Sequence, residues 1–96
     1  MTIQEKIGQL NQLDGRGNIE HFKILIRKGE IRSVMNVTEP EIVNELQEIA
    51  CKQSRMGIPL VFTRDVVHGF KTMLPIPLGQ AATFNPELVE KGARIA

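Results

Sequence analysis

Tryptophan and tyrosine are absent from this sequence, and cysteine occurs once, at Cys51. A lone cysteine excludes an internal disulfide, and an aromatic platform for a ligand would have to use the four phenylalanines or come from elsewhere. No apolar run approaches the roughly 20 residues that cross a bilayer, and the N-terminus lacks the basic and apolar segments of a secretory signal. We therefore expect no membrane partner and a cytoplasmic protein, or a secreted or periplasmic one if the N-terminus is incomplete.

An excess of charge of either sign is also missing. The 12 basic and 11 acidic residues give a net charge of +1 and are interspersed, so no basic stripe predicts a nucleic-acid partner. Histidine occurs only at His21 and His68. Asp65 and His68 have i, i+3 spacing, but a zinc site needs three or four protein ligands. We expect neither a bound metal nor a cofactor.

Hydrophobic periodicity predicts two helices near the N-terminus. Residues 3–13 carry apolar side chains on one helical face, and Thr2 and Glu5 have the spacing of a capping box. A glycine-rich turn follows. A second helix is expected over residues 19–28, with Gly29 as its C-terminal stop.

A strand-helix-strand unit comes next in the sequence. Residues 31–37 predict a short strand, and Thr38 is the expected cap of a long helix that Gly57 ends. The apolar run at 58–62 predicts a buried parallel strand. Because such units are almost always right-handed crossovers, the expected fold class is α/β, with parallel strands and flanking helices.

Residues 63–84 are irregular, apart from a helical turn expected near residues 80–82. A long loop at the carboxyl end of a parallel strand is usually functional, since α/β sheets and barrels keep their sites at that end. Asn85 and Pro86 then begin another helix, whose apolar stripe runs to the end of the sequence without a cap. This ending predicts a truncated chain, and 96 residues are far fewer than the roughly 250 of a closed (β/α)8 barrel.

Arg64, Asp65 and His68 are the candidate functional residues, because an apolar strand delivers them at its carboxyl end. A carboxylate there can accept two hydroxyls of a sugar in short, charge-assisted hydrogen bonds. The alternative for Asp65 is a cap for the amides of residues 66 and 67. The alternative for His68 is a half-buried hydrogen-bonding residue, and for Arg64 a solvated or paired charge. The residues alone leave these alternatives open.

Four sequence blocks together resemble one protein family. They cover residues 2–10, 29–37, 54–70 and 74–89, and the third contains the pattern Asp-x-x-His-Gly. In this order the blocks resemble the family 3 glycoside hydrolases, in particular the bacterial β-glucosidase-like members. The resemblance implies a (β/α)8 TIM-like barrel, with its first strand in the second block and its second strand in the third. Residues 1–96 would then be an N-terminal fragment of that barrel domain, with the barrel not complete in this chain.

The resemblance also implies an activity. It indicates a retaining, exo-acting β-glycosidase of the β-glucosidase type, which hydrolyses terminal non-reducing β-linked sugars of β-glucosides or related oligosaccharides. In that family the carboxylate at the place of Asp65 holds sugar hydroxyls in subsite −1 and is not the nucleophile. For Arg64 and His68 the resemblance implies only a role in shaping the loop or supporting the sugar-binding groups. Asp14 is expected in an Asp-Gly turn and does not match the nucleophile motif. We therefore expect no catalytic nucleophile or acid/base within the chain, which alone would be inactive.

Two other functions remain open from the sequence. The chain could be a stand-alone sugar-binding or interaction module without catalysis, which would hold a sugar through Asp65 or pair through an open sheet edge. It could also belong to a different barrel enzyme, such as an aldolase or isomerase. However, Lys71 is the only lysine near the expected mouth, and no phosphate-binding glycine loop is visible. The sequence does not determine an oligomeric state, but unpaired strand edges predict that the isolated chain is marginally stable, oligomeric or aggregation-prone.

Overall fold

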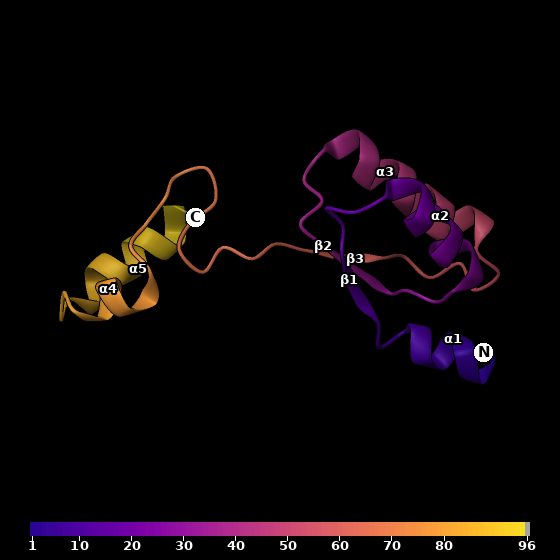
Figure 1. Cartoon of the computed structure of the whole chain (residues 1–96), viewed down its shortest axis with the longest axis horizontal. Helices are drawn as coiled ribbons and strands as arrows, with labels where there is room; N and C mark the ends of the chain where they lie inside the picture. Colours follow the sequence, from indigo (N-terminus) through magenta and orange to yellow (C-terminus); the bar gives the residue numbers. More distant parts are fainter. Residues whose placement is uncertain (96) are drawn as a thin grey trace. The chain divides into compact units, whose positions relative to one another are not determined.

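The computed structural model describes residues 1–95. The chain forms two compact units, Met1–Arg64 and Asp65–Ala96. The first unit contains a three-stranded parallel sheet with helices, and the second contains a loop followed by two helices (Figure 1). The candidate residues predicted from the sequence lie where one unit ends and the next begins, at positions 64, 65 and 68.

The chain begins with a short helix, α1 (Ile3–Gly8), and a strand, β1 (Gln12–Asp14). The predicted capping box is confirmed: the Glu5 amide donates to the Thr2 hydroxyl, and the Thr2 amide donates to the Glu5 carboxylate at 2.6 Å. The predicted continuation of this helix beyond Gly8 is wrong. A turn follows Gly8, and Gln12–Asp14 then form β1, because parallel pairing with the next strand satisfies their backbone groups.

The second helix, α2 (Ile19–Lys28), begins and ends where the sequence predicts. The side chain of Asn18 accepts a hydrogen bond from the Glu20 amide at 3.0 Å, which satisfies one of the donors that a first helical turn leaves unpaired. Gly29 has a φ of 74° and closes the helix in the left-handed conformation, as a glycine C-cap does.

The third helix, α3 (Pro40–Glu48), continues directly into a π-helical segment, η1 (Ile49–Gln53). The predicted cap at Thr38 is wrong. Glu39 occupies the cap position without a side-chain cap bond, and the Thr38 amide donates to the Glu39 carboxylate. The physical reason is Pro40, which stands at the first helical position and favours an extended conformation in the residue before it.

Two further strands, β2 (Ser33–Met35) and β3 (Val61–Thr63), complete the sheet. The order is β1-β2-β3, and both pairings are parallel, so the predicted parallel strand-helix-strand unit is confirmed. Because β1 precedes this unit, the segment expected as the first strand is the second strand of the observed sheet. The strand β2 is central, with Val34 in register with Leu13 of β1 and Phe62 of β3.

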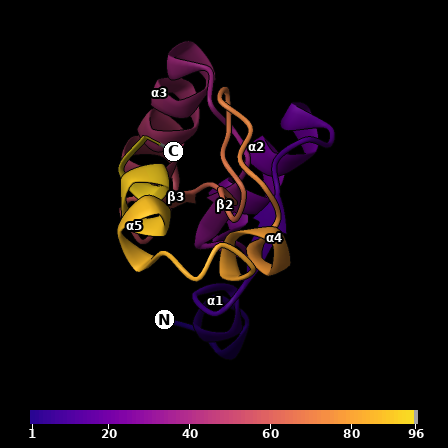
Figure 2. The ribbon, with the colours of Figure 1, turned by 90° about the vertical axis from the view of Figure 1, so that its left-hand side faces the viewer.

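One face of the sheet packs against helices. The middle residues of the three strands, Leu13, Val34 and Phe62, belong to or pack against the core that α2, α3 and η1 complete. Figure 1 shows α2 and α3 together on one side of the strands, and Figure 2 shows them from a second direction. The buried apolar residues are Phe22, Ile26, Ile31, Val34, Val37, Leu46, Ile49, Ala50 and Leu60.

The opposite face of the sheet is not covered by these helices. Because side chains alternate along a strand, this face carries the residues that flank the three middle positions. Gln12 Nε2 donates to Ser33 Oγ and to Thr63 Oγ1, each at 2.8 Å, so one side chain links all three strands. The residues of this open face are Gln12, Asp14, Ser33, Met35, Val61 and Thr63.

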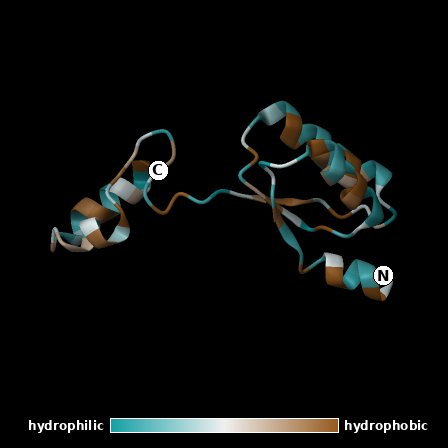
Figure 3. Cartoon of the chain, viewed as in Figure 1, coloured by the Kyte–Doolittle hydropathy of each residue, from teal (hydrophilic) through white to brown (hydrophobic). Residues whose placement is uncertain are grey.

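The second unit contains α4 (Pro77–Ala81) and α5 (Pro86–Ile95). The predicted start of the last helix is confirmed, since the Leu88 amide donates to Asn85 Oδ1 at 3.0 Å. Neither helix contains a buried residue. Figure 3 shows hydrophobic residues along α4 and along α1, and several of them, including Ile3, are exposed.

Candidate functional site

Asp65 opens a loop at the start of the second unit. The side chain is exposed, and its Oδ1 accepts a hydrogen bond from the Val67 amide at 3.1 Å. The turn cap considered from the sequence is therefore present. An ionised carboxylate has two oxygens and about four lone-pair positions, so this bond leaves acceptor capacity for a ligand. The turn orients the carboxylate without excluding a binding role.

The residues that follow Asp65 give the loop its shape. Gly69 has a φ of 95°, and a Cβ at this position would lie 2.0 Å from the carbonyl oxygen of Thr72, so the conformation requires glycine. The carbonyl of His68 accepts a hydrogen bond from the Leu74 amide at 2.7 Å. His68 is half-buried. The sequence pattern Asp-x-x-His-Gly corresponds to a turn with a defined backbone.

Arg64 ends the first unit and is exposed. Its charge has an effect on Glu39, at the start of α3. The pKa of Glu39 lies below its ordinary value mainly because the carboxylate accepts backbone hydrogen bonds at Glu39 and Thr38, and the Arg64 guanidinium adds a smaller electrostatic contribution. Arg64 is thus placed near the carboxyl end of the sheet within the first unit.

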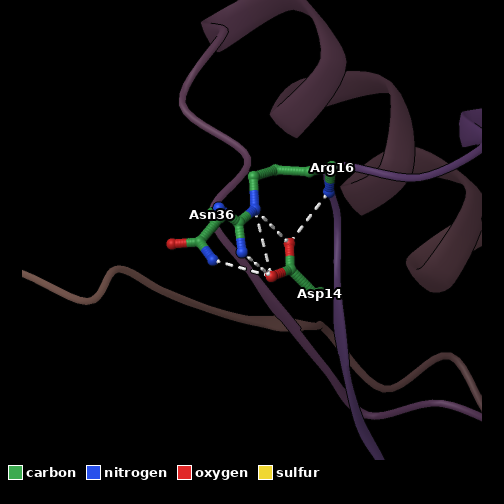
Figure 4. Close-up of polar contacts among 3 residues, drawn as sticks. All are labelled: Asp14, Arg16 and Asn36. Carbon is green, nitrogen blue, oxygen red and sulfur yellow. Dashed lines mark hydrogen bonds and ion pairs between the residues drawn. The ribbon is translucent and has the colours of Figure 1, made fainter.

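A polar cluster that the sequence did not predict lies at the carboxyl ends of β1 and β2 (Figure 4). Asp14 is the last residue of β1, and Asn36 directly follows β2. Asn36 Nδ2 donates to Asp14 Oδ2 at 3.1 Å. Arg16 binds the same carboxylate through its backbone amide, Nε and Nη2, with Nη2 2.5 Å from Oδ2. We call Asp14, Arg16 and Asn36 the strand-end cluster.

The strand-end cluster fixes the ionisation state of its carboxylate. Hydrogen bonds from the Arg16 side chain and backbone hold the pKa of Asp14 far below its ordinary value of 3.8, and the bond from Asn36 adds to this effect against the opposing cost of desolvation. Asp14 is therefore an anion that only accepts hydrogen bonds across the neutral and mildly acidic range. It cannot act as a general acid there, and its oxygens are occupied by neighbours.

The sequence concealed the strand-end cluster for a specific reason. Asp14 and Gly15 form a pair that predicts a turn after a helix, whereas Asp14 in fact ends a strand. Asn36 lies 22 positions further on, and nothing local pairs the two. The available signal is a polar residue at the end of β1 and another directly after β2, since the carboxyl ends of parallel strands share one edge of a sheet.

An apolar groove of about 340 Å³ lies within the second unit. None of the three predicted site residues lines it, so it does not enlarge the candidate site. The lining residues are Leu74, Pro75, Gln80, Thr83, Leu88, Val89, Lys91, Gly92 and Ile95.

The described residues contain no feature that suggests a metal or a membrane span. Among residues 1–95, no three side chains of His, Cys, Asp or Glu are grouped as metal ligands. Across the same residues, no helix combines the length and apolar character needed to span a membrane.

The chain is similar to known glycosidases. The family model described as "Glycosyl hydrolase family 3 N terminal domain" matches residues 2–96. The "Periplasmic beta-glucosidase" of Salmonella typhimurium is 37% identical over 98 residues, which cover 100% of this chain and 13% of that protein. A "Putative beta-xylosidase" of Formosa agariphila is 28% identical over 95% of this chain and 15% of its own length. The "Lysosomal beta glucosidase" of Dictyostelium discoideum is 28% identical over 99% of this chain and also 15% of its own length.

Two conclusions follow from these comparisons. The chain spans 13% to 15% of the length of the curated relatives that it matches. The family domain is of the TIM-barrel type, so the predicted fold class is confirmed, although the three parallel strands described here form an open sheet and not a closed barrel. With its family model matched over nearly its whole length, the chain belongs to glycosyl hydrolase family 3, in the N-terminal domain of that family.

Proposed function

We propose that this chain acts as the N-terminal part of a retaining, exo-acting β-glycosidase of the β-glucosidase type. The observation that carries the proposal is the family match over residues 2–96. It is supported by the similarity, over the whole chain, to a protein named as a periplasmic β-glucosidase. The proposed substrate is a β-glucoside or a related oligosaccharide, attacked at its terminal non-reducing sugar. A relative named as a β-xylosidase makes β-xylosides the second substrate class to test.

Asp65 is the proposed sugar-binding residue of the chain. Its carboxylate is exposed, and the bond from the Val67 amide to Oδ1 restricts its orientation. An oriented anion can accept hydrogen bonds from two adjacent sugar hydroxyls, and such charge-assisted bonds are stronger than neutral ones. We assign Asp65 to subsite −1, with Arg64 and His68 shaping the loop around it.

The covalent chemistry is proposed to come from residues outside this chain. Retaining glycosidases use two carboxyl groups about 5–5.5 Å apart, one as nucleophile and one as acid/base. Asp14, the other aspartate, is bound by Arg16 and Asn36, which leaves it poorly suited to attack a sugar carbon. The chain thus contributes to substrate binding, and residues 1–96 alone are expected to be inactive.

The test is an assay of the complete product of the gene that encodes this chain, with nitrophenyl β-glucoside and β-xyloside as substrates. Asp65→Asn is the informative variant, because an asparagine can still form the turn bond to residue 67 but lacks the negative charge. Charge-assisted hydrogen bonds contribute about 1.5–3 kcal/mol each, so losing two of them predicts a fall in kcat/KM of roughly 100-fold or more.

The matched control is Glu87→Gln, which removes the charge of an exposed carboxylate on α5 and is expected to leave kcat/KM unchanged. A folded wild-type protein that hydrolyses no glycoside would refute the proposed activity. An active protein in which Asp65→Asn behaves like Glu87→Gln would refute only the role of Asp65. Cell fractionation tests whether the complete gene product lies in the cytoplasm or in the periplasm; the Salmonella typhimurium relative is named as a periplasmic protein.

A further inference from the structure

Asn36 has an unusual backbone conformation at the centre of the sheet edge. It directly follows β2, the central strand, and its φ is 69°. Only one other residue besides the glycines, Phe84, has a positive φ among residues 1–95. The left-handed conformation is strained for a residue with a Cβ, and such conformations concentrate at functional sites. Asparagine is among the residues that tolerate it best.

Neighbouring strands hold Asn36 in place on both sides. Its backbone amide donates to the carbonyl of Thr63, the last residue of β3, at 2.9 Å. Its side-chain amide donates to Asp14, the last residue of β1, at 3.1 Å. Three consecutive strand ends are therefore joined through one residue.

The bond to Asp14 also fixes which way the side-chain amide faces. A carboxylate accepts hydrogen bonds and donates none, so the NH2 group of Asn36 must face Asp14, and the carbonyl oxygen must face the other way. Arg16 reinforces this arrangement, because it keeps the same carboxylate ionised and in place. Figure 4 shows Oδ1 of Asn36 directed away from both Asp14 and Arg16. An oriented acceptor of this kind suits a ligand that donates a hydroxyl.

We infer that Asn36 is a substrate-contacting residue whose Oδ1 accepts a hydrogen bond from one sugar hydroxyl, and that Asp14 is the positioning residue that orients it. The inference rests on the proposed glycosidase function and extends it to a second residue, in the first unit of the chain. TIM-type barrels keep their active sites at the carboxyl ends of their strands, and Asn36 stands at that end of the central strand.

A purely structural role for Asn36 makes different predictions. If the residue served only the backbone, glycine would replace it well, because glycine adopts a positive φ without strain. Asn36→Gly keeps the backbone amide that donates to Thr63 and removes only the side-chain amide. A hydroxyl contact would then be lost while the turn is retained.

The experiment measures kcat/KM of the complete gene product with nitrophenyl β-glucoside and with its analogues that each lack one sugar hydroxyl. Asn36→Gly is expected to lower kcat/KM for the parent sugar by about 3- to 10-fold, the effect of one neutral hydrogen bond. For the one analogue that lacks the partner hydroxyl, wild type and variant should have equal kcat/KM. Asn44→Ala removes an exposed amide on α3 and should change neither value.

A second variant keeps the test decisive if Asn36→Gly does not fold. Asp14→Asn retains the shape of the side chain but allows the amide of Asn36 to turn around. Asp14→Asn should lower kcat/KM for the parent sugar. With the analogue that lacks the partner hydroxyl, Asp14→Asn and wild type should have equal kcat/KM. An active enzyme that loses kcat/KM equally with every analogue, or loses none, would overturn the inference and leave the proposed function intact. A wild-type protein that hydrolyses no glycoside would overturn both.

Discussion

Gly8→Ala tests how α1 docks onto the rest of the first unit. Gly8 is the last residue of α1 and is buried. A Cβ at this position would lie 2.0 Å from the carbonyl oxygen of Gly29 and 2.8 Å from the Cα of Glu30. Both obstacles are backbone atoms at the C-terminal end of α2, so no side-chain rotation can relieve the contact. The helix or the cap must move by an ångström or more.

The expected cost follows from this geometry. Overpacking a well-packed site typically costs about 1–3 kcal/mol, and we expect Gly8→Ala to reach the upper part of that range because it meets main chain. With a urea m-value of about 1 kcal/mol/M, the unfolding midpoint should fall by roughly 2 M, and a variant of a chain with a lower midpoint than that should be unfolded without urea. Far-UV circular dichroism is the suitable signal, since the chain has no tryptophan or tyrosine.

Gly17→Ala is the matched control for this prediction. The nearest atom to a Cβ at Gly17 is 3.7 Å away, on the ring of Phe22, which is ordinary contact. The substitution should leave the midpoint unchanged or raise it, because alanine restricts the unfolded chain. Equal midpoints for Gly8→Ala and wild type, at concentrations where both are monomeric, would refute the close docking of α1 against the end of α2.

Two further predictions concern the pH dependence of stability and the self-association of the isolated chain. The pKa values of Asp14 and Glu5 lie below their ordinary values of 3.8 and 4.5, mainly because Arg16 and Arg55 donate hydrogen bonds to them. The stability they contribute is therefore complete above about pH 5 and is lost as the pH falls through their folded-state pKa values. The urea midpoint should fall between about pH 5 and pH 2, and less steeply in Asp14→Asn; equal slopes would contradict the prediction. The isolated chain should self-associate with rising concentration in sedimentation experiments, through the open sheet face and edges. Val61→Lys should weaken this association, whereas Ile24→Lys, at a similarly exposed residue on α2, should not; a monomer at all concentrations would contradict it.

The elements that the sequence predicted well are those specified locally. The start of α2 depends on the Asn18 side chain, its end depends on the positive φ of Gly29, and the start of the last helix depends on Asn85. Each of these signals lies within a few residues of the feature that it determines. The parallel pairing of β2 and β3 was also predictable, because a strand-helix-strand unit has few alternative topologies.

The strand β1 could not be predicted in the same way. Its three residues continue a spacing of apolar side chains that also suits a helix, so local pattern alone favoured the longer helix. What decides the outcome is tertiary. Asn11 accepts backbone hydrogen bonds from Arg32 and Ser33 just ahead of the pairing of β1 with β2. A strand this short depends on its pairing with β2 to satisfy its backbone groups.

The candidate site also contains residues that local sequence predicts and residues that only tertiary structure brings together. Asp65 could be found from the sequence, because an apolar strand followed by Arg, Asp and a glycine loop is a local pattern. The contact between Asp14 and Asn36 spans 22 residues of sequence and depends on β1, which the local pattern does not predict. Once β1 is placed, its carboxyl end must lie beside that of β2, and the pairing of the two polar residues follows.

The open face of the sheet connects the behaviour of the isolated chain with the architecture of the family. Gln12 donates hydrogen bonds to Ser33 and Thr63 across all three strands, which lowers the cost of burying these polar groups. Val61, on the same face, is 46% exposed and gains free energy when covered. A face that combines polar groups bonded to one another with uncovered apolar side chains is suited to the interior of a small barrel, whose inward positions are filled by side chains. The same composition promotes self-association through this face when no further strands cover it. Val61→Lys should therefore raise the monomeric fraction of the isolated chain. In the complete gene product the same substitution should lower the stability of the barrel. A substitution at a surface residue such as Ile24 should not show these opposite effects.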